Sequence, residues 1–209
     1  MKKLYEITGA FASWFALILQ LYISLHYADS RLTALIKYLS FMTIWTNFLV
    51  AFTFTCQLIP SAGRLIRFFK EPAVMGGVLL YIIVVAIVYH LVLTNIWNPQ
   101  GLEKIADEFL HSVVPLLYIF YWLLYVKKGN LSFIYCFKWL IYPLIYLVYS
   151  MIRGALTGVY PYFFLDASRL GFAVTFRNIA FVTTGYILLG IIIIYADRLL
   201  SPKKSDEAH

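Results

Sequence analysis

The stretch FMTIWTNFLVAF, residues 41–52, combines an apolar run with three polar side chains, Thr43, Thr46 and Asn47. It lies within a run, residues 37–60, that is long enough to cross a bilayer as a helix. Positions 43, 46, 47 and 50 follow the spacing i, i+3, i+4, i+7, so the three polar side chains share one helical face. Because lipid cannot satisfy an amide, we expect that face to point into a bundle of helices.

The rest of the chain has the composition of an integral membrane protein. Of its 209 residues, 62% are hydrophobic and only 13% are charged, which excludes an ordinary soluble domain. The first apolar run follows two lysines, as in a signal peptide, but it is long and no small-residue cleavage site closes it. We therefore predict one all-α transmembrane domain over residues 1–209, a bundle of six helices. The expected spans are residues 8–28, 37–60, 73–97, 106–126, 133–155 and 172–196.

Basic residues in the loops predict the orientation of this bundle. The N-terminus, the 61–72 and 127–132 loops and the C-terminus fall on one side, with ten basic residues: Lys2, Lys3, Arg64, Arg67, Lys70, Lys127, Lys128, Arg198, Lys203 and Lys204. The other side has six: Arg31, Lys37, Lys104, Arg153, Arg169 and Arg177. By the positive-inside rule we expect both termini in the cytoplasm. The net charge of +7 is then explained by topology and by anionic headgroups, not by nucleic acid.

A second group of polar residues opens the fourth span at a depth comparable to that of Thr43. Asp107 and His111 are spaced i, i+4 and face the same way. Pro115 has no N–H, so the carbonyl of His111 loses its usual helical partner and we expect the helix to bend there. His90, Arg153 and Tyr160 belong to the same outer half of the predicted bundle. With Thr46, they are candidates for lining a cavity there.

A threonine hydroxyl beside an imidazole is the minimum equipment for nucleophilic catalysis. His111 could take the proton of Thr43 as its oxygen attacks a carbonyl, and return that proton to the leaving group. Asp107 could orient the imidazole, and the amide of Asn47 could donate a hydrogen bond to the developing oxyanion. A site at this depth favours a lipid acyl ester as substrate.

Other interpretations of the same residues remain open. Threonine can bond its own helix, asparagine can join two helices, and acidic residues can cap a helix start. Intramembrane His, Asn and Arg also line transporters and proton pathways, and a lipid-binding protein without activity would fit the same pattern. A metal site is disfavoured because the histidines lack ligand spacing, and Cys56 and Cys136 have no paired spacing, so we expect free thiols and no cofactor.

Three segments resemble a known family in order and spacing. FMTIWTNFLVAF in the second span, LHSVVPLLY at residues 110–118 and GVYPYFFLD at residues 158–166 are similar to the androgen-induced protein and androgen-dependent TFPI-regulating protein family. The likeness is greatest to its bacterial six-span branch and covers nearly the whole chain. It implies a bacterial cell membrane as the location.

The resemblance also implies an activity. Animal members of the family hydrolyse fatty acid esters of hydroxy fatty acids with an intramembrane threonine and histidine, which correspond here to Thr43 and His111. In those proteins the proline follows one residue later than Pro115, and the segment before the histidine is richer in polar residues. Only a lipid acyl ester therefore carries over as the implied substrate class.

Overall fold

The computed structural model describes residues 1–60, 63–94 and 97–202, and within these ranges every regular element is a helix. This confirms the predicted all-α class. The elements in chain order are α1 (Lys2–His26), α2 (Arg31–Tyr38), α3 (Met42–Leu58), α4 (Arg64–Phe68), α5 (Pro72–Val88), η1 (Tyr89–Leu93), α6 (Gly101–Glu108), η2 (Phe109–Val113), α7 (Val114–Tyr125), α8 (Ile134–Lys138), α9 (Ile141–Thr157), η3 (Phe163–Leu165) and α10 (Ala167–Leu199).

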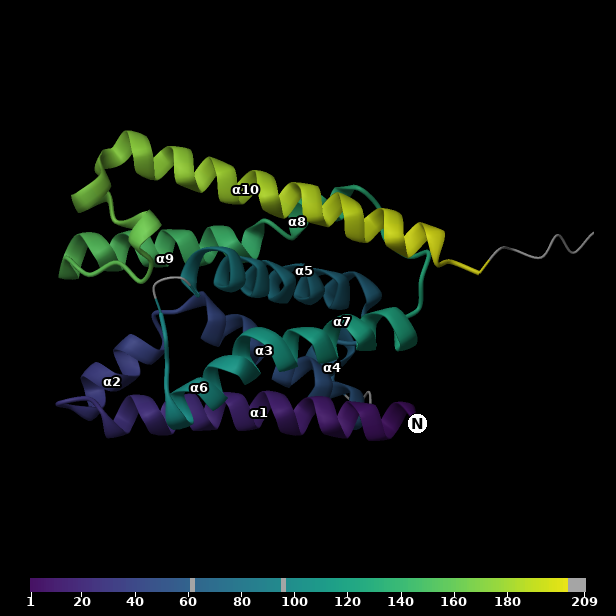
Figure 1. Cartoon of the computed structure of the whole chain (residues 1–209). Coiled ribbons are helices and arrows are strands. Elements are labelled where there is room, and N and C mark those ends of the chain that lie inside the picture. The colour runs from purple at the N-terminus through teal and green to yellow at the C-terminus, as the bar shows by residue number, and fades with distance from the viewer. Residues whose placement is uncertain (61–62, 95–96, 203–209) are drawn as a thin grey trace, which may run out of the picture.

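The long helices run roughly side by side. Helices α1, α3, α5 and the α6–α7 run form one group, and α9 and α10 lie along one side of it (Figure 1). Helix α1 begins and α10 ends at the same end of the bundle, which we call the terminal end. Helix α2, the 158–166 loop and the start of α10 lie at the opposite end, which we call the loop end (Figure 1).

Five helical runs are long and apolar enough to cross a membrane, which is compatible with an integral membrane protein. They are Lys2–His26, Pro72–Leu93, Leu102–Tyr125, Ile134–Thr157 and Ala167–Leu199. A sixth is counted only if α2 and α3 are taken as one span, and these two helices are bent by 76°. The prediction of one continuous helix over residues 37–60 was therefore wrong. Residues 95 and 96 of the third predicted span, and Lys203 and Lys204, lie outside the described residues.

The break between α2 and α3 has a clear hydrogen-bonding basis. Phe41 is extended (φ −92°, ψ 131°) and precedes the first turn of α3. Side chains take the carbonyls of the two residues that follow α2: the Trp45 indole donates to Leu39 O at 2.7 Å, and the Tyr146 phenol donates to Ser40 O at 2.8 Å. Helix α3 thus begins at Met42, and Thr43 lies in its first turn instead of deep within a longer span.

The last helix also begins irregularly. Asp166 caps α10 by accepting hydrogen bonds from the backbone N–H groups of Ser168 and Arg169. Gly171 then adopts φ 72° and ψ 159°, a conformation that favours glycine, and interrupts the helix. The regular part of α10 follows this glycine, which agrees with the predicted start of the sixth span at residue 172.

At the terminal end, a buried lysine closes α7. The Lys128 ammonium donates to the carbonyls of Trp122, Leu123 and Val126, three of the groups that a helix C-terminus leaves unpaired. Burial lowers the pKa of Lys128, and the nearby carboxylate of Asp197 opposes that effect. Lys128 therefore serves the fold as a helix cap as well as contributing to the charge of this end.

Close packing of α1 on α3 rests on a glycine. A Cβ placed on Gly9 would lie 2.6 Å from the ring of Phe54, a side chain that is fully buried and cannot move aside. The aromatic ring therefore occupies the space that any larger residue at position 9 would need.

We expect Gly9→Ala to lower the free energy of unfolding by about 1–3 kcal/mol, because the added methyl overpacks this contact. Gly185→Ala is the matched control, since no atom lies within 4 Å of its Cβ position, and it should be neutral or slightly stabilising. Thermal unfolding of both variants in detergent measures the difference. Equal melting temperatures would contradict the packing described here.

Candidate active site

The structure brings Thr43 and His111 together near the loop end. Thr43 lies in the first turn of α3 and His111 in the middle of η2, and Thr43 Oγ1 is 3.4 Å from His111 Nε2. Both side chains are buried, with 9% and 8% of their surface exposed. A hydroxyl and an imidazole therefore face each other between two helices that are distant in the sequence.

Asp107 fixes the orientation of the imidazole. His111 Nδ1 is 3.2 Å from Asp107 Oδ1 and 3.0 Å from the carbonyl oxygen of the same residue. Both neighbours of Nδ1 are acceptors, so Nδ1 carries the proton and Nε2 keeps its lone pair. In this tautomer Nε2 can accept a proton from Thr43.

Tyr89 supports the same pair from the neighbouring helix. Its ring stacks on the imidazole of His111, with centroids 3.8 Å apart and an angle of 10° between the planes. Its hydroxyl donates a hydrogen bond to Asp107 Oδ2. One tyrosine thus holds both the histidine and the carboxylate, a role that sequence analysis missed, although its neighbour His90 drew attention to this turn.

Tyr89 and His111 each lie in a π-helical turn, η1 and η2 respectively. In η1 the Thr94 N–H bonds to Tyr89 O at 3.1 Å, and in η2 the Val114 N–H bonds to Phe109 O, each across five residues. Pro115 follows η2 and lacks an N–H, which removes one regular helical bond. A wider turn therefore precedes Pro115, and such turns are frequent at functional sites.

Asn47 joins the two helices that carry Thr43 and His111. It is fully buried, and its amide donates to Thr43 O at 2.9 Å and to Leu110 O at 3.2 Å. Both of its N–H donors are thus used on backbone carbonyls, which leaves none for the oxyanion role that we expected. Its Oδ1 is buried with no hydrogen-bond partner among the described residues.

The start of α3 offers other donors beside Thr43. The first N–H groups of a helix have no partner within it, and Phe41 provides no side-chain cap. Burial raises the pKa of Tyr162, and the Thr43 hydroxyl and the N–H groups of Thr43 and Met42 oppose that effect. These N–H groups lie at the positive end of the helix dipole, where an oxygen that carries negative charge is favoured. Sequence analysis could not find them while α3 was predicted to begin earlier.

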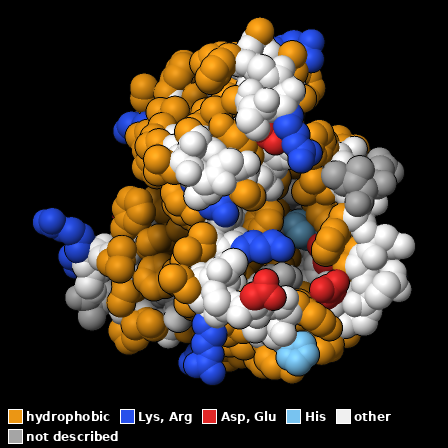
Figure 2. Space-filling view, turned by 90° about the vertical axis from the view of Figure 1, so that its left-hand side faces the viewer, with side chains coloured by type: hydrophobic (Ala, Val, Ile, Leu, Met, Phe, Trp, Pro, Cys, Tyr) orange, Lys and Arg blue, Asp and Glu red, His pale blue; other side chains and the backbone are white. Residues whose placement is uncertain are grey.

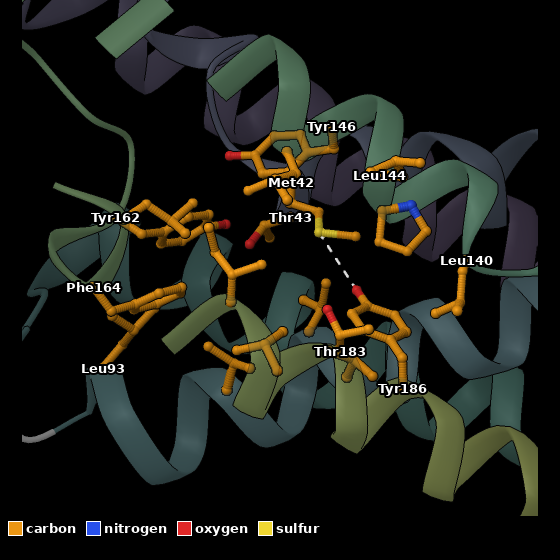
Figure 3. A pocket seen from close by; sticks show the side chains of 18 residues that line it. Met42, Thr43, Leu93, Leu140, Leu144, Tyr146, Tyr162, Phe164, Thr183 and Tyr186 are labelled. Atoms are coloured by element: carbon orange, nitrogen blue, oxygen red, sulfur yellow. Dashed lines mark hydrogen bonds between the residues drawn. The ribbon is translucent and has the colours of Figure 1, made fainter. Parts of the chain in front are cut away.

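Two cavities meet at this site. The larger chamber, of about 610 Å³, is lined by Thr43, Asp107, His111 and Tyr89, together with polar and apolar residues of α1, α2 and the 158–166 loop. Figure 2 looks onto the loop end and shows a hollow rimmed by acidic and basic side chains, with a histidine in its depth. A second, apolar cavity of about 240 Å³ lies between α5, α9 and α10 and also reaches Thr43 (Figure 3).

The four residues that we expected to line a cavity have other contacts. Thr46 shares a hydrogen bond of 2.9 Å with the Tyr142 hydroxyl, and His90 Nε2 is 3.2 Å from Ser112 Oγ. Arg153 donates to Val159 O at 2.5 Å, and the ring of Tyr160 packs on Gly154. None of the four is among the described side chains around the two cavities; the 158–166 loop contributes the next three residues, Pro161, Tyr162 and Phe163.

Within the described residues, no group of three or more His, Cys, Asp or Glu side chains is arranged to hold a metal ion. Cys56 and Cys136 are both buried free thiols. The chemistry of the site is therefore that of a hydroxyl, an imidazole, a carboxylate, a phenol and backbone N–H groups.

Comparison with protein-family models, with curated proteins and with solved structures gives no match for this chain. The function of the site must therefore be inferred from its geometry and chemistry.

We expect Asn47→Ala to lower the free energy of unfolding by about 1–3 kcal/mol, because it removes the hydrogen bond between α3 and η2 inside an apolar bundle. Asn98→Ala, at an exposed position, is the control and should change stability by less than about 0.5 kcal/mol. Thermal unfolding in detergent tests both variants. A similar melting temperature for the two would show that the amide of Asn47 does not stabilise the bundle.

Proposed function

We propose that the protein is an integral membrane hydrolase of lipid acyl esters, with Thr43 as nucleophile and His111 as general base. The observation that carries the proposal is the buried row Thr43–His111–Asp107 on the wall of a chamber. A nucleophile, a base within reach of it and a third group that orients the base are the usual parts of a covalent hydrolase. The similarity to the intramembrane threonine hydrolases noted above supports the same chemistry.

The reaction would proceed through an acyl-threonine. Nε2 of His111 takes the Thr43 proton while Oγ1 bonds to the ester carbonyl carbon, whose oxygen becomes an oxyanion. The N–H groups of Met42 and Thr43 would donate to that oxyanion. The imidazolium then gives its proton to the leaving alkoxide as the ester C–O bond breaks. Water repeats the sequence on the acyl-threonine, which releases the fatty acid and restores the Thr43 hydroxyl.

Asp107 and Tyr89 would act on the base. The carboxylate accepts from Nδ1 and stabilises the imidazolium that forms during each proton transfer. The Tyr89 hydroxyl occupies the other carboxylate oxygen, so that Oδ1 stays directed at the ring. Tyr89 is therefore a positioning residue in this scheme.

The proposal includes an orientation in the membrane. Because α1 begins and α10 ends at the terminal end of the bundle (Figure 1), the helices between them must cross the membrane an even number of times, which supports counting the bent α2–α3 pair as the sixth span. With the ten basic residues of that side in the cytoplasm of a bacterial cell, the loop end and its chamber face the outer leaflet. Lipid esters would then reach the site from that leaflet.

Replacement of either reacting group tests the mechanism. We expect Thr43→Ala and His111→Ala each to lower the hydrolysis of p-nitrophenyl octanoate by at least about 10³-fold, because no other group supplies the lost function. Thr43→Ser keeps a hydroxyl and should retain activity. A fluorophosphonate probe should label the wild type and spare Thr43→Ala.

Thr184→Ala is the control for this series, since its exposed hydroxyl bonds only Ala180 O among the described groups. Labelling that persists in Thr43→Ala would exclude Thr43 as the nucleophile. Protein that cleaves no ester, but moves protons or a solute across liposomes with the same residues required, would establish a transporter. Protein that binds lipid with Thr43 dispensable would establish a lipid-binding protein.

Replacement of Asp107 or Tyr89, which contact the base, should change the kinetics in distinct ways. We expect Asp107→Asn to lower kcat by roughly 10²–10⁴-fold, since the amide favours the wrong tautomer of His111. Tyr89→Phe keeps the stacked ring and loses only the hydroxyl, so kcat should fall about tenfold with KM unchanged. Tyr22→Phe, on the exposed face of α1, is the control. A rise in KM at constant kcat in Tyr89→Phe would assign Tyr89 to substrate binding instead.

A further inference from the structure

The two cavities that meet at Thr43 differ in chemistry. Among the side chains described around the smaller one, none is charged, and most belong to Val, Leu, Ile, Phe and Pro residues of α5, α9, α10 and the 158–166 loop. The larger chamber includes the charged residues Asp29, Lys37 and Glu103 near its mouth. Thr43, Leu93 and Tyr162 belong to both linings. The hydroxyl of Thr43 thus lies at the boundary between an apolar cavity and a chamber that also holds charged side chains.

The position of His111 indicates which cavity would hold the alcohol of an ester and which would hold its acyl group. His111 lines the larger chamber and is not among the residues around the apolar cavity. The leaving oxygen of an ester must receive its proton from this imidazole, so the alcohol has to lie on the chamber side. The acyl group stays on Thr43 after the alcohol leaves, and the remaining direction from Thr43 leads into the apolar cavity.

A contact between two side chains crosses that cavity. The Tyr186 hydroxyl of α10 lies 3.5 Å from the sulfur of Met42, the residue before Thr43. In Figure 3 this contact lies between the part of the cavity at Thr43 and the part at Leu140. A methionine side chain is flexible and its hydrogen bond to sulfur is weak, so this barrier can be altered without a change of the helices.

On the basis of the hydrolase proposed above, we infer that the apolar cavity holds the acyl chain of the ester and that the Met42–Tyr186 contact limits the length of chain it accepts. An engineered cavity of about 150 Å³ holds the six carbons of benzene. By the same ratio, the whole cavity of about 240 Å³ takes at most about ten carbons, counted on both sides of this contact. The preferred substrates are therefore esters of medium-chain fatty acids with a polar alcohol.

A series of p-nitrophenyl esters from butyrate to palmitate measures this limit. Wild type should have its highest kcat/KM between octanoate and decanoate. Met42→Ala removes one side of the contact and should raise the ratio of kcat/KM for palmitate over octanoate roughly tenfold. Val182→Phe fills the cavity from α10 and should move the optimum to butyrate.

Met151→Ala is the matched control, a half-buried methionine on α9 that is not among the residues described around either cavity. It should keep the wild-type chain-length profile. Thermal unfolding of all variants shows which of them fold. If Met42→Ala and Val182→Phe both fold and leave the profile unchanged, the inference is overturned.

A binding measurement separates this inference from the proposed activity. In Thr43→Ala protein, a decanoic acid with a terminal diazirine should crosslink on irradiation to cavity residues such as Phe164 and Val85, and unlabelled decanoate should compete. Such crosslinks without ester cleavage by the wild type would support the acyl site while refuting the hydrolase. Crosslinks confined to chamber residues such as Gln20 and Ile23, with cleavage intact, would refute the acyl site alone. No specific crosslink would also overturn it.

Discussion

The break between α2 and α3 is stabilised by side chains that take over the backbone hydrogen bonds that it leaves open. Trp45 and Tyr146 satisfy the two carbonyls at Leu39 and Ser40. The bond to the Ser40 carbonyl is buried, and a buried polar group left without a partner costs roughly 2–7 kcal/mol. The start of α3 at Met42, and hence the position of Thr43 with unpaired N–H groups beside it, depends on these two bonds.

The site occupies the part of the bundle where the helices are irregular. A regular helix in a membrane satisfies all its own backbone groups and offers only side chains to a substrate. Here a helix start and two π-helical turns come together, and they carry Thr43, Tyr89 and His111. Asn47 then locks two of these irregular segments to each other. The polar interactions of this region thus maintain the shape of the chamber as well as its chemistry.

Part of this arrangement follows from the sequence. The helical class follows from composition, and the approach of Thr43 to His111 follows from their equal depth and from the need of polar faces to meet in lipid. Tyr89 and Tyr162 could not be singled out, because the chain has 17 tyrosines and their placement at helix ends is ordinary in membrane proteins. The donors of Asn47 and the start of α3 were misjudged for one reason. Periodicity within a span gives the direction of a face, but it does not show where tertiary hydrogen bonds interrupt the helix.

The turn η2 has a consequence for how such a site can arise. A π-helical turn is one residue longer than the α-helical turn it replaces. Removal of one residue from Phe109–Val113 would restore a regular helix and change the direction of the residues within the turn, His111 among them, while the flanking segments keep nearly the same orientation. The imidazole would then leave the hydroxyl, while the apolar faces of the bundle could still pack. A single inserted codon is therefore enough to separate an inert bundle of this architecture from one that holds a base against a nucleophile.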